Sequence, residues 1–129
     1  MALWSRPPSK VDQTIVEGPY ANCLHACVAS LLHAKLHELP SRSSEIDVWL
    51  ADAWGLFMLT VDAQHAPLLA PAAAGVYCVG VGSRLSGAEL HAVVIGPIGE
   101  HGRLPIYHDP APDRRGLSSI GTLSFLAVR

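Results

Sequence analysis

The sequence predicts an α+β domain in which two helices precede a mostly antiparallel sheet. In residues 23–54, apolar side chains recur at the spacing of helices. From residue 57 onwards they gather instead in short runs, separated by Gly and Pro turn signals, as in closely spaced strands. Two helices followed by several such strands imply the α+β fold class.

The composition fits one folded domain. Of the 129 residues, 50% are apolar and 16% are charged, which suffices for a packed core. The net charge of -2 gives no basic field, so no nucleic-acid partner is expected. Three cysteines cannot all pair within one chain, which favours free thiols and a reducing compartment. Without a signal peptide or an apolar run of roughly 18 residues, we expect a cytoplasmic protein with no membrane partner.

The segment ahead of the first helix is predicted to be irregular. Residues 1–10 contain two prolines and are expected to form a flexible arm, which leaves residues 11–129 as the single domain. Residues 11–17 fit a short extended piece, and Gly18-Pro19-Tyr20 is a turn signal.

The first helix is predicted from Cys23 to about His33. Asn22 is a favourable residue for its N-cap. Apolar residues surround this helix almost completely, so it belongs inside the domain.

A second helix is predicted from about Ser44 to Trp54. The serines before it offer caps, and Gly55 fits the C-terminal stop. Its inward face is expected to carry Ile46, Trp49, Leu50 and Ala53, which recur at helical spacing.

Five strands are predicted in the second half of the chain, each as a short run bounded by turn residues. They are Phe57–Val61, Gly75–Val81, Leu90–Ile95, Pro105–Asp109 and Leu123–Val128. The Ala- and Pro-rich stretch from Ala66 to Gly75 is expected to be a loop.

Cys23 is the best candidate for a nucleophile. In the first turn of a helix, unpaired backbone N–H groups and the positive end of the dipole stabilise a thiolate. Free cysteines are otherwise mostly buried and inert, and we expect this of Cys27 and Cys78, which lie in apolar surroundings. His25 follows Cys23 by two residues, so it faces away and is expected to be a packing or surface residue.

His91 and Asp109 are the candidate partners of Cys23. His91 opens one strand and Asp109 closes the next, so a hairpin of the two strands brings both residues to one end of the sheet. The imidazole could then activate the thiol while the carboxylate orients the imidazole. Because strand residues alternate faces, His108 should point away from the site. The competing interpretations are a solvated strand end for His91 and a turn-initiating role for Asp109.

An oxyanion intermediate needs hydrogen-bond donors, and the sequence offers two. One is the backbone N–H of Cys23, and the other is the side-chain amide of Gln13. We expect no cofactor and no metal. A metal site of Cys23, Cys27 and histidines ranks last, because no motif has the spacing of a structural zinc site.

Four segments together carry a family resemblance: Asp12–Thr14, Asn22–Leu32, His91–Val94 and His108–Pro110. With them, the chain resembles small papain-like cysteine peptidases of the bacteriocin-processing (double-glycine peptidase-like) type, especially stand-alone proteins of bacteria and phages. The resemblance implies a papain-like fold, in which the Cys helix packs on a mostly antiparallel sheet. It also implies a nucleophilic Cys23, a basic His91, an orienting Asp109 and an oxyanion-binding Gln13.

Two functions are therefore predicted. The first is a cysteine hydrolase with a Cys-His-Asp triad, acting on a peptide or another amide or thioester bond, with a peptide or protein as substrate. Protease, deamidase and acyl-transferase chemistry all stay open, because the same machinery serves each of them. The alternative is a peptidase-fold binding module with weak or no catalysis, such as a phage-encoded inhibitor of a host protein.

Overall fold

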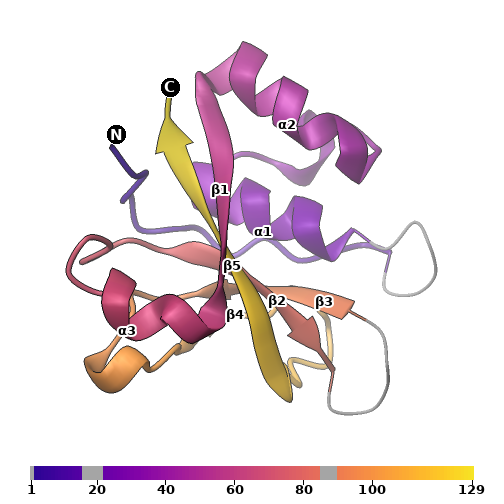
Figure 1. The fold of residues 1–129 in the computed structure, drawn as a ribbon. Coiled ribbons are helices and arrows are strands. Elements are labelled where there is room, and N and C mark those ends of the chain that lie inside the picture. Colours follow the sequence, from indigo (N-terminus) through magenta and orange to yellow (C-terminus); the bar gives the residue numbers. More distant parts are fainter. Residues whose placement is uncertain (1, 16–21, 85–89) are drawn as a thin grey trace.

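A single five-stranded antiparallel sheet organises the fold, in the order β1-β5-β2-β3-β4 (Figure 1). The computed structural model describes residues 2–15, 22–84 and 90–129. The strands are β1 (Leu56–Asp62), β2 (Cys78–Ser83), β3 (Leu90–Ile95), β4 (Ile106–His108) and β5 (Ser119–Val128). All four strand pairs are antiparallel, which confirms the predicted fold class and sheet type.

Helices cover both faces of this sheet. Helix α1 (Cys23–Leu32) and the helical run around α2 (Ile46–Trp49) pack on one face, together with Ala92 and Val94. Helix α3 (Ala66–Leu69) lies on the other face, where Val93 contributes to a second core cluster (Figure 1). Because strand side chains alternate, a continuous apolar run in β3 supplies both cores.

Helix α1 agrees with its predicted bounds and with its predicted burial. Every residue from His25 to Leu32 is buried, as expected for a helix that is apolar on nearly all sides. It ends at His33, which adopts the left-handed conformation with φ 58°.

The second helical run extends from Ser43 to Trp54, close to its predicted bounds, but it is not one regular α-helix. A 3-10 turn precedes α2, and a π-helical segment, Leu50–Trp54, follows it. Ile46 and Leu50 are buried as predicted, whereas Ala53 is exposed. The wider π turn rotates later residues away from the inward face, so the predicted burial of Ala53 is wrong.

The stretch predicted as a loop from Ala66 to Gly75 begins instead with α3. Pro67 lies in its first turn, where a missing N–H costs nothing, so the helix tolerates it. The turns that follow end at Gly75 with φ 73°. Strand β2 therefore starts at Cys78, opposite Ile95, and not at Gly75. The remaining 3-10 turns are Leu36–Glu38, Ser43–Glu45, Ala63–His65 and Glu100–Gly102.

The first residues pack on the domain, unlike the predicted flexible arm. Leu3 forms a bridge with Ala127 at the end of β5, and the indole of Trp4 donates to the backbone carbonyl of Leu31 at 2.8 Å. The Trp4 ring also meets Trp54 edge-on, with centroids 6.0 Å apart. These long-range contacts carry no periodic signal in the sequence. The predicted turn at residues 18–20 lies outside the described residues.

Within the described ranges, no helix is both long enough and apolar enough to cross a bilayer.

Candidate active site

The fold brings Cys23, His91 and Asp109 together from three elements. Cys23 is the first residue of α1, His91 is the second residue of β3, and Asp109 directly follows β4. Strand β3 pairs with β4 and also contacts α1, so it carries His91 between the other two residues.

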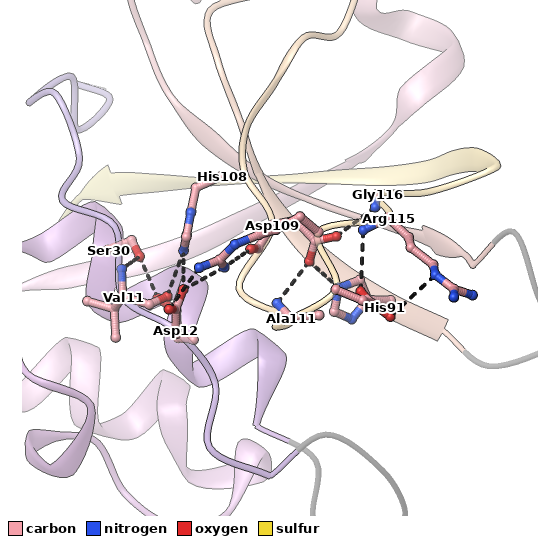
Figure 2. A network of polar contacts seen from close by, with 12 residues as sticks. Val11, Asp12, Ser30, His91, His108, Asp109, Ala111, Arg115 and Gly116 are labelled. Atoms are coloured by element: carbon pink, nitrogen blue, oxygen red, sulfur yellow. Dashed lines mark hydrogen bonds and ion pairs between the residues drawn. The ribbon is translucent and has the colours of Figure 1, made fainter.

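His91 and Asp109 form a buried contact. The Nε2 nitrogen of His91 donates to Oδ1 of Asp109 at 2.7 Å, and both side chains are only 4% exposed (Figure 2). Asp109 also accepts hydrogen bonds from the backbone N–H groups of Ala111 (3.0 Å) and Gly116 (2.6 Å). Burial alone would raise the pKa of Asp109, but these hydrogen bonds lower it to about 2. The carboxylate is therefore ionised at neutral pH.

Cys23 interacts with the same imidazole. Since Asp109 holds Nε2, the nitrogen left for the Cys23 thiol is Nδ1. Burial raises the pKa of Cys23, yet hydrogen bonds from His91 and from the backbone N–H groups of Ala92 and Leu24 bring it below its ordinary value. Burial likewise lowers the pKa of His91, while Asp109 and Cys23 raise it to about 9. These opposite shifts favour a thiolate–imidazolium pair.

The start of α1 differs from its prediction, because the Asn22 side chain does not cap the helix. Its Oδ1 accepts hydrogen bonds from the backbone N–H groups of Thr14 and Ile15, each at 3.0 Å. Its Nδ2 donates to Oγ1 of Thr14 at 2.9 Å. The backbone of Asn22, with ψ 35°, lacks the extended conformation of a capping residue, so its side chain turns to the preceding segment.

The Asn22 side chain binds none of the backbone N–H groups at the start of α1, near the Cys23 sulfur. No hydrogen bond with another described residue occupies the backbone N–H of Cys23. This N–H, at the start of the helix, is the candidate donor to an oxyanion that would form on a carbonyl attacked by Cys23.

Gln13 is buried beside the corner that carries Asp109. Its backbone N–H donates to the carbonyl of Pro110 at 3.0 Å, and its Nε2 donates to the carbonyl of Ile15 at 2.9 Å. Its Oε1 has no hydrogen-bond partner among the described residues, which also show no hydrogen bond between Gln13 and Cys23. The oxyanion role of Gln13 stays a prediction.

Comparison of the chain with protein-family models, with curated proteins and with solved structures finds no match. The resemblance to papain-like peptidases therefore rests on the residues quoted above.

A polar cluster behind Asp109 was not predicted from the sequence. Both terminal nitrogens of Arg114 donate hydrogen bonds to the Asp12 carboxylate, at 2.6 and 2.8 Å. Arg114 also donates to the backbone carbonyl of Asp109. His108 points away from His91, as predicted, and its Nε2 lies 3.0 Å from Val11 O and from Asp12 Oδ1 (Figure 2). Nothing in the local sequence signals the pairing of Asp12 with Arg114, because these two residues lie 102 positions apart.

The other two cysteines are buried and free, as predicted. Burial raises the pKa of Cys78 to about 12 and that of Cys27 well above its ordinary value, so both stay protonated thiols. In the part of the chain that the structure describes, no group of three or more His, Cys, Asp or Glu residues could hold a metal ion.

Proposed function

We propose that the protein is a cysteine hydrolase that cleaves a peptide bond or another amide or thioester bond. Cys23 is the nucleophile, His91 is the general acid and base, and Asp109 orients the imidazole. The observation that supports this most directly is the buried 2.7 Å contact between His91 and Asp109, because it leaves Nδ1 of His91 for Cys23. A papain-like fold belongs to the same proposal, since a helix carries the thiol and an antiparallel sheet carries the base.

The first half of the reaction forms an acyl-enzyme. The Cys23 thiolate attacks the substrate carbonyl carbon, and the carbonyl π electrons move to the oxygen, which the N–H of Cys23 can stabilise. When the tetrahedral intermediate collapses, the bond to the leaving group breaks. Nδ1 of His91 supplies the proton that the departing amine or thiol needs. The product is a thioester on Cys23 and a neutral imidazole.

Hydrolysis of the thioester restores the enzyme. Nδ1 of His91 takes a proton from water as the water oxygen attacks the acyl carbon, and the Cys23 thiolate leaves. The imidazolium and the thiolate are then both regenerated. Because Cys23 must stay reduced for this cycle, the proposal includes a reducing, cytoplasmic location.

One observation favours the alternative function. The Gln13 amide donates to Ile15, so at least one of its hydrogens is directed within the protein and not to a substrate. A binding module with the same fold, which forms no acyl-enzyme or releases none, would tolerate this arrangement. This second candidate predicts stoichiometric binding without turnover.

Alkylation by iodoacetamide at pH 6 tests the proposal. An ordinary thiol with a pKa near 8.5 is roughly 0.3% ionised at this pH, so a fast reaction reports an activated cysteine. We expect peptide mass spectrometry to find rapid modification of Cys23, while the buried Cys27 and Cys78 stay unmodified as internal controls. His91→Ala should slow Cys23 to the rate of free cysteine. A wild-type rate equal to that of free cysteine would contradict the hydrolase and leave the binding module.

A further inference from the structure

The sheet has two edge strands, β1 and β4, and the chain protects only one of them (Figure 1). Strand β4 is three residues long and lies between Pro105 and Pro110, which have no N–H to offer a further strand. Strand β1 has seven residues and pairs with β5 without a shift of register. From Leu56 to Val61 it contains neither a charged residue nor a proline. Edge strands usually carry such residues, because these prevent pairing with another chain.

The outer edge of β1 has free backbone groups, and the register shows which residues carry them. The N–H of Arg129 donates to the carbonyl of Gly55 at 3.1 Å, so these two residues form a hydrogen-bonded pair. Bonded pairs alternate along an antiparallel ladder, so every second residue of β1 from Phe57 onwards bonds to β5. The backbone groups of the residues between them point to the open edge: Leu56, Met58 and Thr60. Among the described residues, no turn or loop bonds to the backbone of these three.

The side chains of β1 are mostly apolar and are not fully covered. Phe57, Leu59 and Val61 are partly exposed, and strand alternation places them on one face. Met58 is also partly exposed, where it packs against the core cluster of α1. A further strand beside β1 would cover these side chains and bond to the free backbone groups. The edge is therefore an interaction surface for an extended segment.

The backbone of a second copy of β1 fits this edge. In the antiparallel register that pairs all seven residues, Leu59 faces the same residue of the second copy. Met58 then faces Thr60, so residues with free backbone groups face each other on both sides of the two-fold axis. Each such pair can exchange two hydrogen bonds.

The side chains also match across this two-fold axis. Phe57 faces Val61, so an aromatic side chain meets a β-branched one on either side of Leu59. Asp62, which carries the one charge of the strand, faces Leu56, so like charges do not meet. A foreign segment would have to supply this alternation independently, whereas a second copy supplies it by symmetry.

We propose that the protein forms a dimer in which the β1 strands of two copies pair about a two-fold axis at Leu59, so that two five-stranded sheets become one. Association stops at the dimer, because the pairing uses the unprotected edge of each copy. Cys23, His91 and Asp109 lie near β3 and β4, toward the opposite edge of the sheet, so both sites stay open. The inference does not depend on the proposed function, since none of its evidence involves these three residues.

Analytical ultracentrifugation tests the dimer. Wild type should be dimeric and should dissociate to monomers across about a hundred-fold dilution. Leu59→Lys should lose the dimer, because like charges would face each other at the axis, while circular dichroism shows the monomer to be folded. A mixture of Leu59→Lys with Leu59→Glu should regain the dimer, since opposite charges then meet. Ile106→Lys is the matched control and should stay dimeric, because it changes an apolar residue, 43% exposed, of the other edge strand.

Disulfide cross-linking tests the register. In the Cys23→Ala background, Leu59→Cys should form an intermolecular disulfide on mild oxidation, because facing residues of a non-hydrogen-bonded pair lie within disulfide range. Phe57→Cys should not, because the two introduced thiols would lie about 13 Å apart along the strands. A protein that is monomeric at every concentration, or a dimer that Leu59→Lys leaves intact, would overturn the proposal. Equal cross-linking of the two cysteine variants would overturn it as well.

Discussion

Arg114 binds the Asp12 side chain through two hydrogen bonds and the Asp109 backbone through a third. The ion pair of Asp12 and Arg114 links the segment that contains Gln13 to the loop that begins with Asp109. One guanidinium thereby holds two of the candidate catalytic residues in place relative to each other, although it touches neither Cys23 nor His91. Under the proposed function Arg114 is a positioning residue, and its loss should affect the chemistry more than the stability.

Arg114→Ala should slow the labelling of Cys23 several-fold with little change in melting temperature, because the ion pair is exposed and such pairs stabilise weakly. Arg114→Lys should not restore the rate, since an ammonium cannot replace the two parallel hydrogen bonds. Labelling kinetics and thermal melting on each variant provide the test. Arg115→Ala, which removes an exposed neighbour, is the matched control. A melting temperature that falls in proportion to the rate would point to a merely structural role.

Cys23→Ala and Cys27→Ser should have opposite effects. Cys23 lies partly exposed at the site, so its replacement should abolish labelling and barely change the melting temperature. Cys27 is fully buried, and a serine hydroxyl left unpaired there should cost about 1–3 kcal/mol of unfolding free energy. Chemical denaturation and labelling of both variants measure this. Equal stability losses would argue that Cys23 is a packing residue.

Asp109→Asn should lower the rate of hydrolysis by about ten-fold or more without abolishing it, because the imidazolium loses its charged partner while the thiol stays. Asparagine has no ionisable side chain, so the variant also lacks the pH-dependent stabilisation that the Asp109 carboxylate gives. That carboxylate stabilises the folded state at neutral pH, and this contribution disappears as the pH falls from about 4, the unfolded value, to about 2. The stability gap between wild type and variant should therefore narrow across this window. A gap that stays constant there would show that the ionised carboxylate is not what stabilises the fold.

The pH dependence of the reaction should reflect the Cys23–His91 pair. The alkylation rate of Cys23 should reach half its maximum below the pH expected of an ordinary thiol. Hydrolysis should decline above about pH 9, where His91 loses the proton that the leaving group requires. His91→Gln should move the alkylation midpoint up to about 8.5, the value for an unperturbed cysteine. An unchanged midpoint in this variant would mean that His91 does not activate the thiol.

Gly82→Ala should disrupt the strand that supports His91. Gly82 pairs with His91 across the β2–β3 ladder, and an added Cβ would lie 1.8 Å from the backbone oxygen of Ser119. The backbone cannot move aside as a flexible side chain could. We therefore expect the free energy of unfolding to fall by about 1–3 kcal/mol. Gly121→Ala is the control, because its Cβ would be 3.7 Å from the nearest atom, an ordinary contact. Urea denaturation of both variants tests the difference, and equal losses would contradict this account.

The elements with strong local signals were predicted well. Strand β3 has its predicted bounds, Leu90–Ile95, because a continuous apolar run between turn signals leaves little choice of register. Helix α1 was predicted from its apolar surface, and the pairing of β3 with β4 follows from their succession along the chain. The juxtaposition of His91 and Asp109 could then be inferred from the ends of two neighbouring strands.

Features that depend on distant partners were not predictable in this way. Strand β5 begins at Ser119, four residues before the predicted start, since pairing with β1 and β2 extends it beyond its apolar core. Asn22 is a residue type that often caps helices, yet its side chain accepts hydrogen bonds from the backbone N–H groups of Thr14 and Ile15 instead. The Asp12–Arg114 pair has no periodic or motif signal, because it exists only once the fold has formed.

The central position of β5 has a consequence for biosynthesis. This strand follows the other four in the chain but lies between β1 and β2, so a ribosome has released every other strand before the sheet can close. Until then, β1 has no partner within the sheet and β2 has one unpaired edge, and nascent chains with such edges are prone to aggregate. Cys23 precedes both His91 and Asp109 in the chain, so under the proposed function its thiol would stay unactivated until both partners have been made. Such an order would spare the cell a reactive cysteine on an unfinished chain.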